Sequence, residues 1–476
     1  MIADCARRHL RSVLCRTALA AVGVALLPSC ADFRGPEYRV PDTPAKSSWS
    51  QPAASVSAPD TITQDWWREF RDPYLDGLVD KAIAGNFDIK VLAARIQVAG
   101  AQIAEVQAQA LPTVDVAAGA IFTKSTGQST QRRYDVGVQA NWEIDIWGKV
   151  EKGVQAQTAE YRATEADWRA GFLTLVSAVA TTYFQILQFD EQIDQQRKAL
   201  ATNKTILAIY EAQFANGLVP QTQVIRQRAE INQLTTDLLE LQRLRDVSEN
   251  ALATLTGVPA GEFKVPRGYL RDKVQAPVVP AGLPSQMLAR RPDIIAAEYR
   301  VLSAYDLVGQ AKLAQLPSVS LTGRAGTASL SPSDLFRTFT LSFLPSINFP
   351  LFDPGIKARI KTSEAQTKVV EEDYRRTVMA AYEEVENTLV NLAARQKQRT
   401  QLEEQTEQLR VVATQIEAQL KVGVVSQLEV FESERQMLRA ELLLLAIHQQ
   451  ILSDTVTLYK TLGGGWPTVT VRNESK

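Results

Sequence analysis

Cysteine and histidine are the side chains that most often do covalent or metal chemistry, and this chain has few of either. Its 476 residues include three cysteines and two histidines. Cys5, Cys15 and His9 lie in the first 29 residues, which have the pattern of a removable signal, so the mature chain keeps Cys30 and His448. These two residues cannot build a disulfide or a zinc cluster. The sequence also has no phosphate loop, nucleophile elbow or metal motif, so we expect no catalytic residue, no metal, no cofactor and no enzyme.

Cys30 is the residue whose surroundings predict covalent chemistry. Four arginines within the first 16 residues are followed by an apolar run at 17–27 and then by Leu27-Pro28-Ser29-Cys30. This order is typical of a secretory signal, and the apolar run is too short for a membrane-spanning helix, which needs about 20 residues. The placement of Cys30 resembles a bacterial lipobox, with Pro28 as an unusual member, and predicts a covalent lipid on Cys30. The alternative is ordinary signal cleavage nearby.

The elements that follow are organised as an internal repeat. Tyr210-Glu211-Ala212-Gln213 recurs as Ile416-Glu417-Ala418-Gln419, and the same offset pairs Gly217 with Gly423. Such spread-out matches predict two copies of one unit. The stretch between them is rich in proline, and we expect it to form a small mixed equatorial region. The predicted boundaries are a signal peptide at 1–29, a lipid-anchored extended segment at 30–64, repeat 1 at 65–257, the equatorial linker at 258–284, repeat 2 at 285–465 and a C-terminal tail at 466–476.

Strands are predicted from alternation. From Tyr134 to Ile146 every even position is apolar and every odd position is polar or glycine, which is a strong strand pattern. If the odd face points inward, Asp135, Glu143 and Asp145 line a wet, acidic barrel lumen. The four expected strands lie at about 113–123, 134–147, 318–328 and 338–352.

Long helices are predicted on either side of a glycine turn. The stretch 149–214 has no proline, and many of its apolar residues recur near the 3.5-residue coiled-coil spacing. About 65 residues at 1.5 Å each make a rod on the order of 100 Å. We expect long helices at 149–214 and 355–420, turns at Gly217 and Gly423, and return helices at 220–256 and 427–462. A further helix of roughly 35 residues should precede each first strand.

The number of strands predicts assembly. Strands of about 9–11 tilted residues can cross a bilayer, but an open four-stranded sheet would leave its edge N–H and C=O groups unpaired in lipid. A membrane barrel needs at least about eight strands, and three chains would supply twelve. We therefore expect a mixed all-α plus membrane β-barrel fold: a homotrimer sharing a twelve-stranded barrel, continued by an α-helical coiled-coil barrel. The alternative for the strands is a half-buried sheet in a soluble sandwich.

Several motifs together carry a family resemblance. They are Trp66-Trp67 with Phe70 and Asp72-Pro73; Trp142-Glu143-Ile144-Asp145-Ile146-Trp147-Gly148; Arg290-Arg291-Pro292-Asp293-Ile294; and Tyr459-Lys460-Thr461-Leu462-Gly463-Gly464-Gly465-Trp466. With them the chain resembles the TolC-like outer-membrane factors, in particular the lipoprotein branch that includes NodT and OprM. In that family three chains share one barrel and one periplasmic tunnel, which docks on a periplasmic adaptor protein and, through it, an inner-membrane pump.

The resemblance implies a passive exit duct for small toxic compounds in a tripartite efflux system of the RND type. It also implies a protein that is lipid-anchored in the outer membrane, with its helical part in the periplasm. Ala31 follows Cys30 where inner-membrane lipoproteins carry aspartate, which fits outer-membrane sorting. The net charge of −1 gives no electrostatic reason to expect nucleic acid as a partner.

The resemblance also suggests where a gate and a docking surface lie. Leu428, Glu432 and Arg435 fall at i, i+4 and i+7 and so share one helix face. Matching family positions hold an apolar residue, an acid and a base that close the periplasmic end, and a related member has acids at the positions of Glu429 and Glu432. The adaptor-docking tips match Gly217, Val219, Gly423 and Ser426. The alternatives are a solvated helix face with a weak ion pair and ordinary helix-breaking turns.

Other functions remain as alternatives. Within the channel class these are type I protein secretion and metal efflux. An alternative of another class is a periplasm-spanning coiled-coil lipoprotein without a pore. The long heptad repeats would allow it, but such a protein has no use for amphipathic barrel strands. Asp293 follows Pro292 in the Arg-Arg-Pro-Asp motif and is expected to cap the next helix, which is a structural role.

Overall fold

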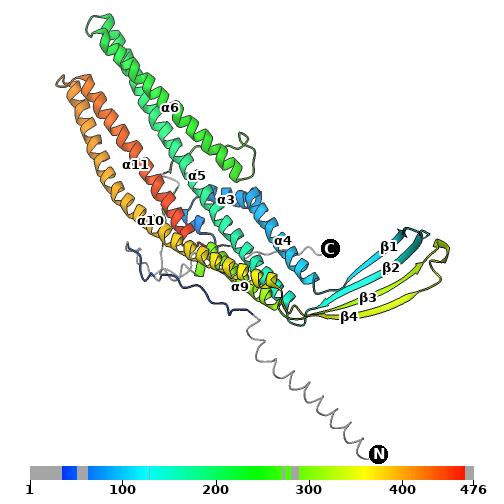
Figure 1. Ribbon diagram of the computed structural model, residues 1–476. Helices are drawn as coiled ribbons and strands as arrows, with labels where there is room; N and C mark the ends of the chain where they lie inside the picture. Colours follow the sequence, from blue (N-terminus) through cyan, green and yellow to red (C-terminus); the bar gives the residue numbers. More distant parts are fainter. Residues whose placement is uncertain are drawn as a thin grey trace, which may run out of the picture. The chain divides into compact units, whose positions relative to one another are not determined.

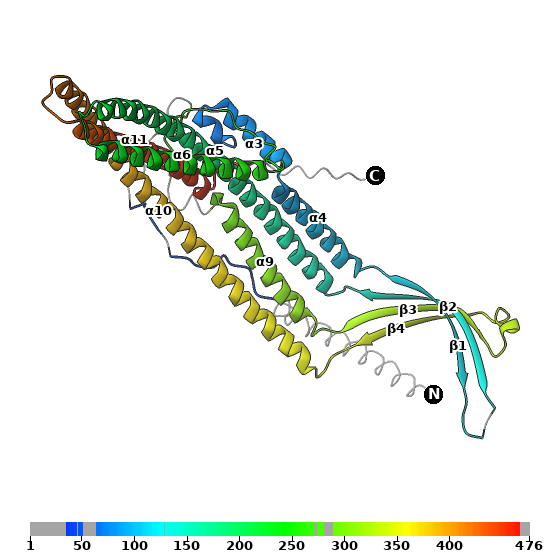
Figure 2. The same ribbon diagram turned by 90° about the horizontal axis from the view of Figure 1, so that it is seen from above.

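The computed structural model describes residues 35–44, 46–50, 63–127, 129–270, 274–279 and 289–466. The chain separates into two compact units (Figures 1 and 2). Unit 1 comprises 1–42, 95–165 and 296–376, and unit 2 comprises 43–94, 166–295 and 377–476. Cys30 and the whole predicted signal lie outside the described residues, as do parts of the equatorial linker and of the C-terminal tail.

The chain alternates helices with two pairs of strands. In order, the elements are η1 (Trp66–Phe70), α3 (Pro73–Gly85), α4 (Phe87–Ala108), β1 (Thr113–Thr123), β2 (Gln131–Ile144), α5 (Lys149–Ala215), α6 (Gln221–Leu255), α9 (Pro292–Leu313), β3 (Ser318–Ser329), η2 (Pro332–Asp334), β4 (Thr340–Asn348), α10 (Pro354–Lys421) and α11 (Gln427–Thr461). The described residues are therefore mostly helical, with one four-stranded sheet.

The sheet of unit 1 is antiparallel throughout, in the order β1-β2-β3-β4. Directly opposed residues point to the same face. One row across the sheet is Val116, Val138, Ala325 and Leu341, and the next row is Asp115, Gln139, Arg324 and Ser342. The register thus gives an apolar face and a polar face, and β1 and β4 are left as open edges.

Four predicted elements differ in the structure. Strand β2 covers 131–144, where 134–147 was predicted, and α9 has 22 residues, where roughly 35 were predicted. Strand β4 covers 340–348, which is shorter than the predicted 338–352. The helix of roughly 35 residues before the first strand is two helices, α3 and α4, which are separated at Asn86. The Asn86 side chain accepts a hydrogen bond from Ile89 N (3.0 Å) and donates one to Leu255 O (3.1 Å). The break follows from Gly85-Asn86, because an asparagine amide can cap a new helix.

An aromatic core joins the ends of the chain in unit 2. Trp66 stacks on Tyr459 with ring centroids 4.9 Å apart, and Phe70 lies 5.1 Å from Phe184. The hydroxyl of Tyr459 donates to Glu69 Oε2 (2.5 Å). The motif that begins with Trp66-Trp67 and the motif that begins with Tyr459, far apart in sequence, thus pack in one core.

Helix α5 contains an 18-residue window that is long and apolar enough, by composition alone, to cross a membrane. Most of that window is buried inside the structure. Buried core helices of folded units meet the same criterion, and α5 supplies core residues such as Val176, Tyr183 and Phe184. Burial against the rest of the chain therefore accounts for this apolar stretch.

Candidate functional site

The candidate lumen residues lie on or next to the polar face of the sheet. Asp135 and Glu143 belong to β2 and face Ala328 and Ser320 across the β2–β3 register. Glu143 accepts a hydrogen bond from Lys149 Nζ at 3.0 Å, so its charge is balanced within the same chain. Both residues of this ion pair are about half exposed.

Asp145 is placed differently from its predicted position. Strand β2 ends at Ile144, and Asp145 follows it. Its Oδ2 accepts hydrogen bonds from Val150 N (2.9 Å) and Glu151 N (3.1 Å), the first backbone donors of α5. A carboxylate at a helix start satisfies orphan N–H groups and complements the helix dipole. Asp145 thus lies beyond the end of β2 and caps the start of α5, so its predicted place within the strand was wrong, whereas its place at a barrel lumen stays a prediction.

The two turns of unit 2 have closely similar geometry. Gly217 and Gly423 adopt positive φ angles of 71° and 77°. The residue after each glycine donates a backbone hydrogen bond five residues back: Leu218 N to Gln213 O (2.9 Å) and Val424 N to Gln419 O (3.0 Å). This is the Schellman ending of a helix, which glycine adopts at least cost.

The residues around these turns differ in exposure. Val219 is half-buried and packs against the small core of Ile206, Tyr210 and Val224, whereas its neighbour Leu218 is 75% exposed. Three apolar side chains that were not among the predicted tip residues are exposed at the tips: Leu218, Val422 and Val424. The sequence signal for these three residues is an apolar side chain close to a turn glycine, a place where polar residues are usual.

The candidate gate residues lie on the first three turns of α11. Arg435 Nη2 donates to Glu432 Oε2 at 2.5 Å, and Gln436 Nε2 donates to Glu432 Oε1 at 3.2 Å. The hydrogen bond from Gln436 and the charge of Arg435 lower the pKa of Glu432. Leu428 is 54% exposed, and Ser426, the residue before α11, donates to Glu429 Oε1 at 3.4 Å.

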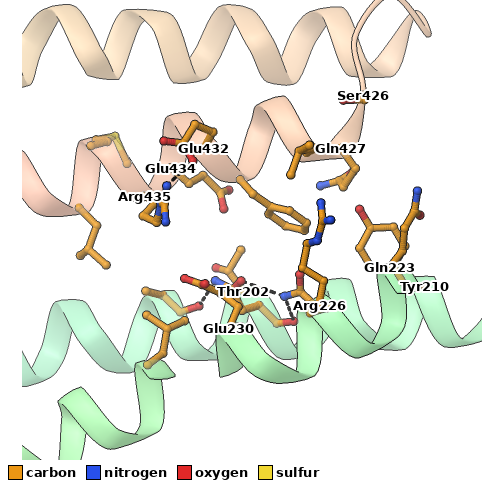
Figure 3. Close-up of a pocket in the computed structure, with 18 of the residues that line it drawn as sticks. Thr202, Tyr210, Gln223, Arg226, Glu230, Ser426, Gln427, Glu432, Glu434 and Arg435 are labelled. Carbon is orange, nitrogen blue, oxygen red and sulfur yellow. Dashed lines mark hydrogen bonds and ion pairs between the residues drawn. The ribbon is translucent and has the colours of Figure 1, made fainter. Parts of the chain in front are cut away.

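Three of the four candidate gate residues border a groove of about 810 Å³ between α11 and the α5–α6 pair, and Glu429 lies outside its lining (Figure 3). Leu428, Glu432 and Arg435 line it from α11, and Arg226 and Glu230 line it from α6. Tyr210 of α5 meets Phe431 of α11 edge to face, with ring centroids 6.1 Å apart. Val219 and Ser426 also line the groove. The structure therefore brings predicted gate residues and predicted tip residues to one surface.

Glu434 lines the groove but was not among the predicted site residues. It is half-buried on α11, and burial raises the pKa of its carboxyl group. The negative charge of Glu417 raises that pKa further. Its sequence signal was weak, because an acid two residues after Glu432 falls on a different side of the helix.

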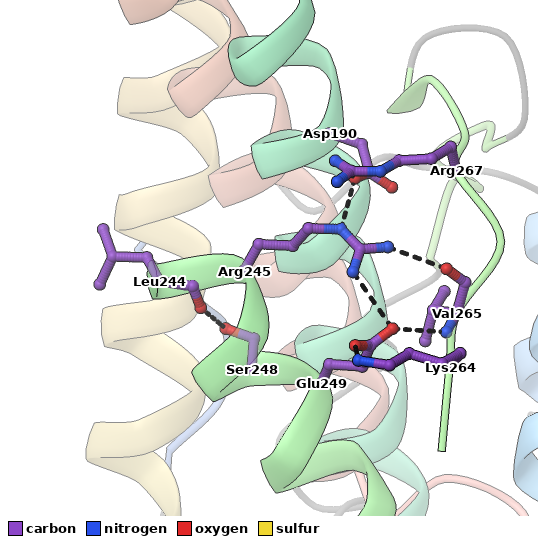
Figure 4. Close-up of polar contacts among 8 residues, drawn as sticks. All are labelled: Asp190, Leu244, Arg245, Ser248, Glu249, Lys264, Val265 and Arg267. Carbon is purple, nitrogen blue, oxygen red and sulfur yellow. Dashed lines mark hydrogen bonds and ion pairs between the residues drawn. The ribbon is translucent and has the colours of Figure 1, made fainter. Parts of the chain in front are cut away.

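A buried charge cluster fixes α5 to α6 and to the segment after α6 (Figure 4). Arg245 of α6 donates to Asp190 Oδ1 (2.6 Å), to Glu249 Oε1 (3.1 Å) and to Val265 O (2.8 Å). Arg267 and Lys264 complete the cluster at Asp190 (2.5 Å) and Glu249 (2.9 Å). Burial opposes the charge of Glu249, but Lys264, Val265 N–H and Arg245 together hold its pKa below the ordinary value.

The Arg-Arg-Pro-Asp motif has a structural role, but this role differs from the predicted helix capping by Asp293. Helix α9 begins at Pro292, and Asp293 accepts hydrogen bonds from Arg291 (3.0 and 2.7 Å). Arg291 is buried and also donates to Thr461 O (3.0 Å) and Glu384 Oε2 (2.8 Å). Arg291 thus ties the start of α9 to the end of α11 and to the middle of α10. The carboxylate of Asp293 accepts from the Arg291 guanidinium, whereas the prediction had it capping the helix.

Comparison with known proteins gives consistent matches along the chain. The pattern of the family described as outer membrane efflux protein matches residues 78–258 and again residues 283–464. The cation efflux system protein CusC of Escherichia coli O6:H1 is 30% identical and covers 94% of this chain and 97% of its own length. The pyoverdine export outer membrane protein OpmQ of Pseudomonas putida is 28% identical and covers 88% and 92%.

A solved structure has the same fold. The outer-membrane channel OprN superposes with a TM-score of 0.81 at 28% sequence identity. The match covers 91% of this chain and 99% of that one. The similarity therefore extends over the strands, the long helices and the stretch between the two family matches, and it is not confined to one motif.

Proposed function

Because the chain belongs to the outer membrane efflux protein family, we propose that it is the exit duct of a tripartite efflux system. In this role it passively conducts small toxic compounds across the outer membrane from an inner-membrane pump of the RND type and a periplasmic adaptor. The observation that carries the proposal is the sheet of unit 1, which has one apolar face and two open edges.

The open edges support a shared barrel. In lipid, every backbone N–H and C=O group needs a partner, so β1 and β4 must pair with strands of other chains. Four strands are too few to close a barrel, and three copies supply twelve. A homotrimer with the polar face inward places Asp135 and Glu143 in a wet lumen. Two matches to one family pattern support the duplication of a helix–strand unit within each chain.

Aromatic residues near both ends of the apolar face support its placement in a bilayer. Tyr134 and Phe122 lie near the β1–β2 turn, and Trp142 lies eight residues further along β2. Eight strand residues span about 26 Å along the strand, or about 20 Å of height at the roughly 40° tilt of barrel strands, which fits within the roughly 25 Å apolar band between aromatic girdles. The helices then occupy the periplasm, and the lipid on Cys30 is a second anchor, which radiolabelled palmitate should detect on the wild type and not on Cys30→Ala.

The groove and the tips support the gate and docking roles. In the described chain the Glu432–Arg435 ion pair lies within one helix, so gating needs these side chains to meet their equivalents in other copies around an axis. Exposed Leu218, Val422 and Val424 next to Gly217 and Gly423 offer apolar contacts to an adaptor. Binding of the adaptor to an open conformation would then shift the population towards opening.

Metal efflux is the second candidate, because one of the two relatives at about the same identity is named as a cation efflux protein. A deletion strain separates the two by its sensitivities. Export of organic compounds predicts sensitivity to dyes, detergents and antibiotics, and metal efflux predicts sensitivity to toxic metal cations only.

The direct test is on the purified protein. We expect the detergent-solubilised protein to have the mass of three chains and to form ion-conducting pores in a planar bilayer. A monomer without conductance would contradict the proposal. A trimer without conductance, even after gate substitutions, would favour the poreless coiled-coil scaffold.

A further inference from the structure

The groove between α11 and the α5–α6 pair contains a carboxylate whose charge the described chain does not balance. Glu434 lines the groove from α11, where it is half-buried (Figure 3). Within the residues that the structure describes, it forms no hydrogen bond and no ion pair. Burial raises the pKa of its carboxyl group, and the negative charge of Glu417 on α10 raises that pKa further. The charged form of Glu434 therefore needs a cation that the chain itself does not supply.

Most other charged side chains of the groove lining have partners in the chain. The exceptions, among the described residues, are Glu230 and Arg226, which both lie on α6. Arg226 is exposed, whereas Glu230 is half-buried. With Glu434, two carboxylates and one exposed guanidinium thus have no ion pair, so the unpaired charge of the lining is negative. The lining charges that are paired belong to the ion pairs Arg435–Glu432 (2.5 Å), Lys198–Asp194 (2.9 Å) and Arg410–Glu441 (3.3 Å).

Apolar side chains lie next to Glu434 on the wall of the groove. On α11, Phe431, Glu434 and Leu438 are spaced at i, i+3 and i+7, so they share one helix face. All three line the groove. Tyr210 of α5 meets Phe431 edge to face, with ring centroids 6.1 Å apart. One wall of the groove thus presents an aromatic ring, an unpaired carboxylate and an aliphatic side chain in succession.

These features select a class of ligand. The volume of about 810 Å³ lies in the range of sites for drug-sized molecules, roughly 300–1,000 Å³. An aromatic ring in the groove packs on Phe431 and Tyr210, and a positive charge on that ring is also attracted to aromatic faces. A protonated nitrogen on the same molecule pairs with Glu434. A neutral ligand leaves this carboxylate unpaired, and an anion is repelled by it.

We propose that the groove binds a planar aromatic cation, with its charged nitrogen at Glu434 and its ring on Phe431 and Tyr210. The site is built by a single chain, so it does not depend on the proposed homotrimer. Leu428 and the Glu432–Arg435 pair line the same groove, so the bound cation lies beside the candidate gate.

Two fluorescent probes of the same shape test the charge requirement. 9-Aminoacridine is a planar cation at neutral pH, whereas acridine has the same three-ring system and is largely uncharged there. Fluorescence anisotropy of each probe, titrated with the purified protein in detergent and corrected for detergent alone, measures binding. We expect saturable binding of 9-aminoacridine and an affinity for acridine that is at least about tenfold lower, because only the cation pairs with Glu434.

Substitutions locate the site. Glu434→Gln keeps the shape of the side chain and removes its charge, so it should weaken 9-aminoacridine binding by about tenfold and leave acridine binding nearly unchanged. Phe431→Leu removes a ring and no charge, so it should weaken both probes by about two- to tenfold. The matched control is Glu240→Gln, which removes an exposed acid of α6 that lies outside the groove lining, and it should bind both probes as the wild type does.

The outcomes separate this site from the exit duct. Absence of saturable binding, equal affinity for the two probes, or 9-aminoacridine binding that Glu434→Gln does not weaken overturns the cation site. Each of these results leaves the groove as a surface for the adaptor and leaves the exit duct standing. The predicted pattern in a protein without conductance would support the site while the exit duct fails.

Discussion

Arg245 holds three segments of unit 2 together through one buried side chain. Its guanidinium reaches Asp190 on α5, Glu249 on its own helix and the backbone oxygen of Val265 beyond α6. Arg245, Asp190 and Glu249 are almost completely buried, so their charges depend on one another. Removing one partner from such a cluster is costly because the remaining charges stay buried without compensation.

We predict that Arg245→Met lowers the stability of the folded protein by about 3–5 kcal/mol. Thermal unfolding of the purified protein, followed by circular dichroism, measures the change. The control is Arg243→Met on the same helix, because Arg243 pairs with Glu240 at the exposed surface and exposed pairs contribute little. Equal effects of the two substitutions would contradict the assignment of the buried cluster.

The low pKa of Glu249 gives the same cluster a defined pH dependence. A carboxyl group with a lowered folded-state pKa contributes its stability above the unfolded-state value, which is about 4.3 for glutamate. That contribution is lost as the pH falls through the lower folded-state pKa. The wild type should therefore lose stability in acid below about pH 4.

The gate assignment makes a prediction for three residues of α11. Replacing Leu428, Glu432 and Arg435 together by serine removes the apolar contact and both charges, so single-channel conductance in a planar bilayer should rise. The change acts on closure and leaves the groove-lining Phe431 and Tyr210 in place. Conductance equal to that of the wild type would refute the gate. Serine at Glu240 and Arg243 on α6 is the control, since this exposed pair lies outside the groove.

At the scale of the elements, backbone geometry determines which residues fit the two helix-to-helix turns at Gly217 and Gly423. At both glycines an added Cβ would meet no heavy atom within 4 Å, so there is space for a side chain. The obstacle is the positive φ angle, which β-branched residues adopt only with strain. Substitutions there change the shape of the tip and leave the core untouched.

We therefore predict that Gly217→Val together with Gly423→Val abolishes export in a complemented deletion strain, while the trimer still assembles. Blue native electrophoresis measures assembly, and growth on a toxic compound measures export. Loss of the trimer would show instead that the turns serve folding alone. The control is Gly77→Val on α3, a helical glycine whose added Cβ would also meet open space.

At the scale of the whole molecule, the fold alone does not choose the cargo. A relative named for pyoverdine export and one named for cation efflux are similarly close to this chain, at 28% and 30% identity. A duct that spans the membrane needs a wet polar face and closed edges, and both requirements are independent of what passes through. Substrate choice is therefore expected to lie largely with the pump.

Much of the secondary structure followed from the sequence because its causes are local. Period-two alternation locates β1 and β3 closely, and the glycines at 217 and 423 mark turns because few other residues accept their φ angles. The boundary errors have local causes too. Asp145 continues the alternation in the sequence, so it was predicted in the strand. In the structure its carboxylate accepts from the N–H groups of Val150 and Glu151 at the start of α5.

The sequence by itself determined the element types through periodicity and turn residues, and the family through its motifs, because these are properties of the chain alone. The prediction of partner chains also comes from the sequence, through the number of strands. The tertiary structure decided which distant side chains meet. Arg245 with Asp190, Arg291 with Glu384 and Tyr210 with Phe431 are separated by 55 or more residues and carry no mutual signal in the sequence. The physical reason is that burial and contact depend on how helices pack against each other. Packing involves two segments at once, so the pattern of one segment does not reveal it.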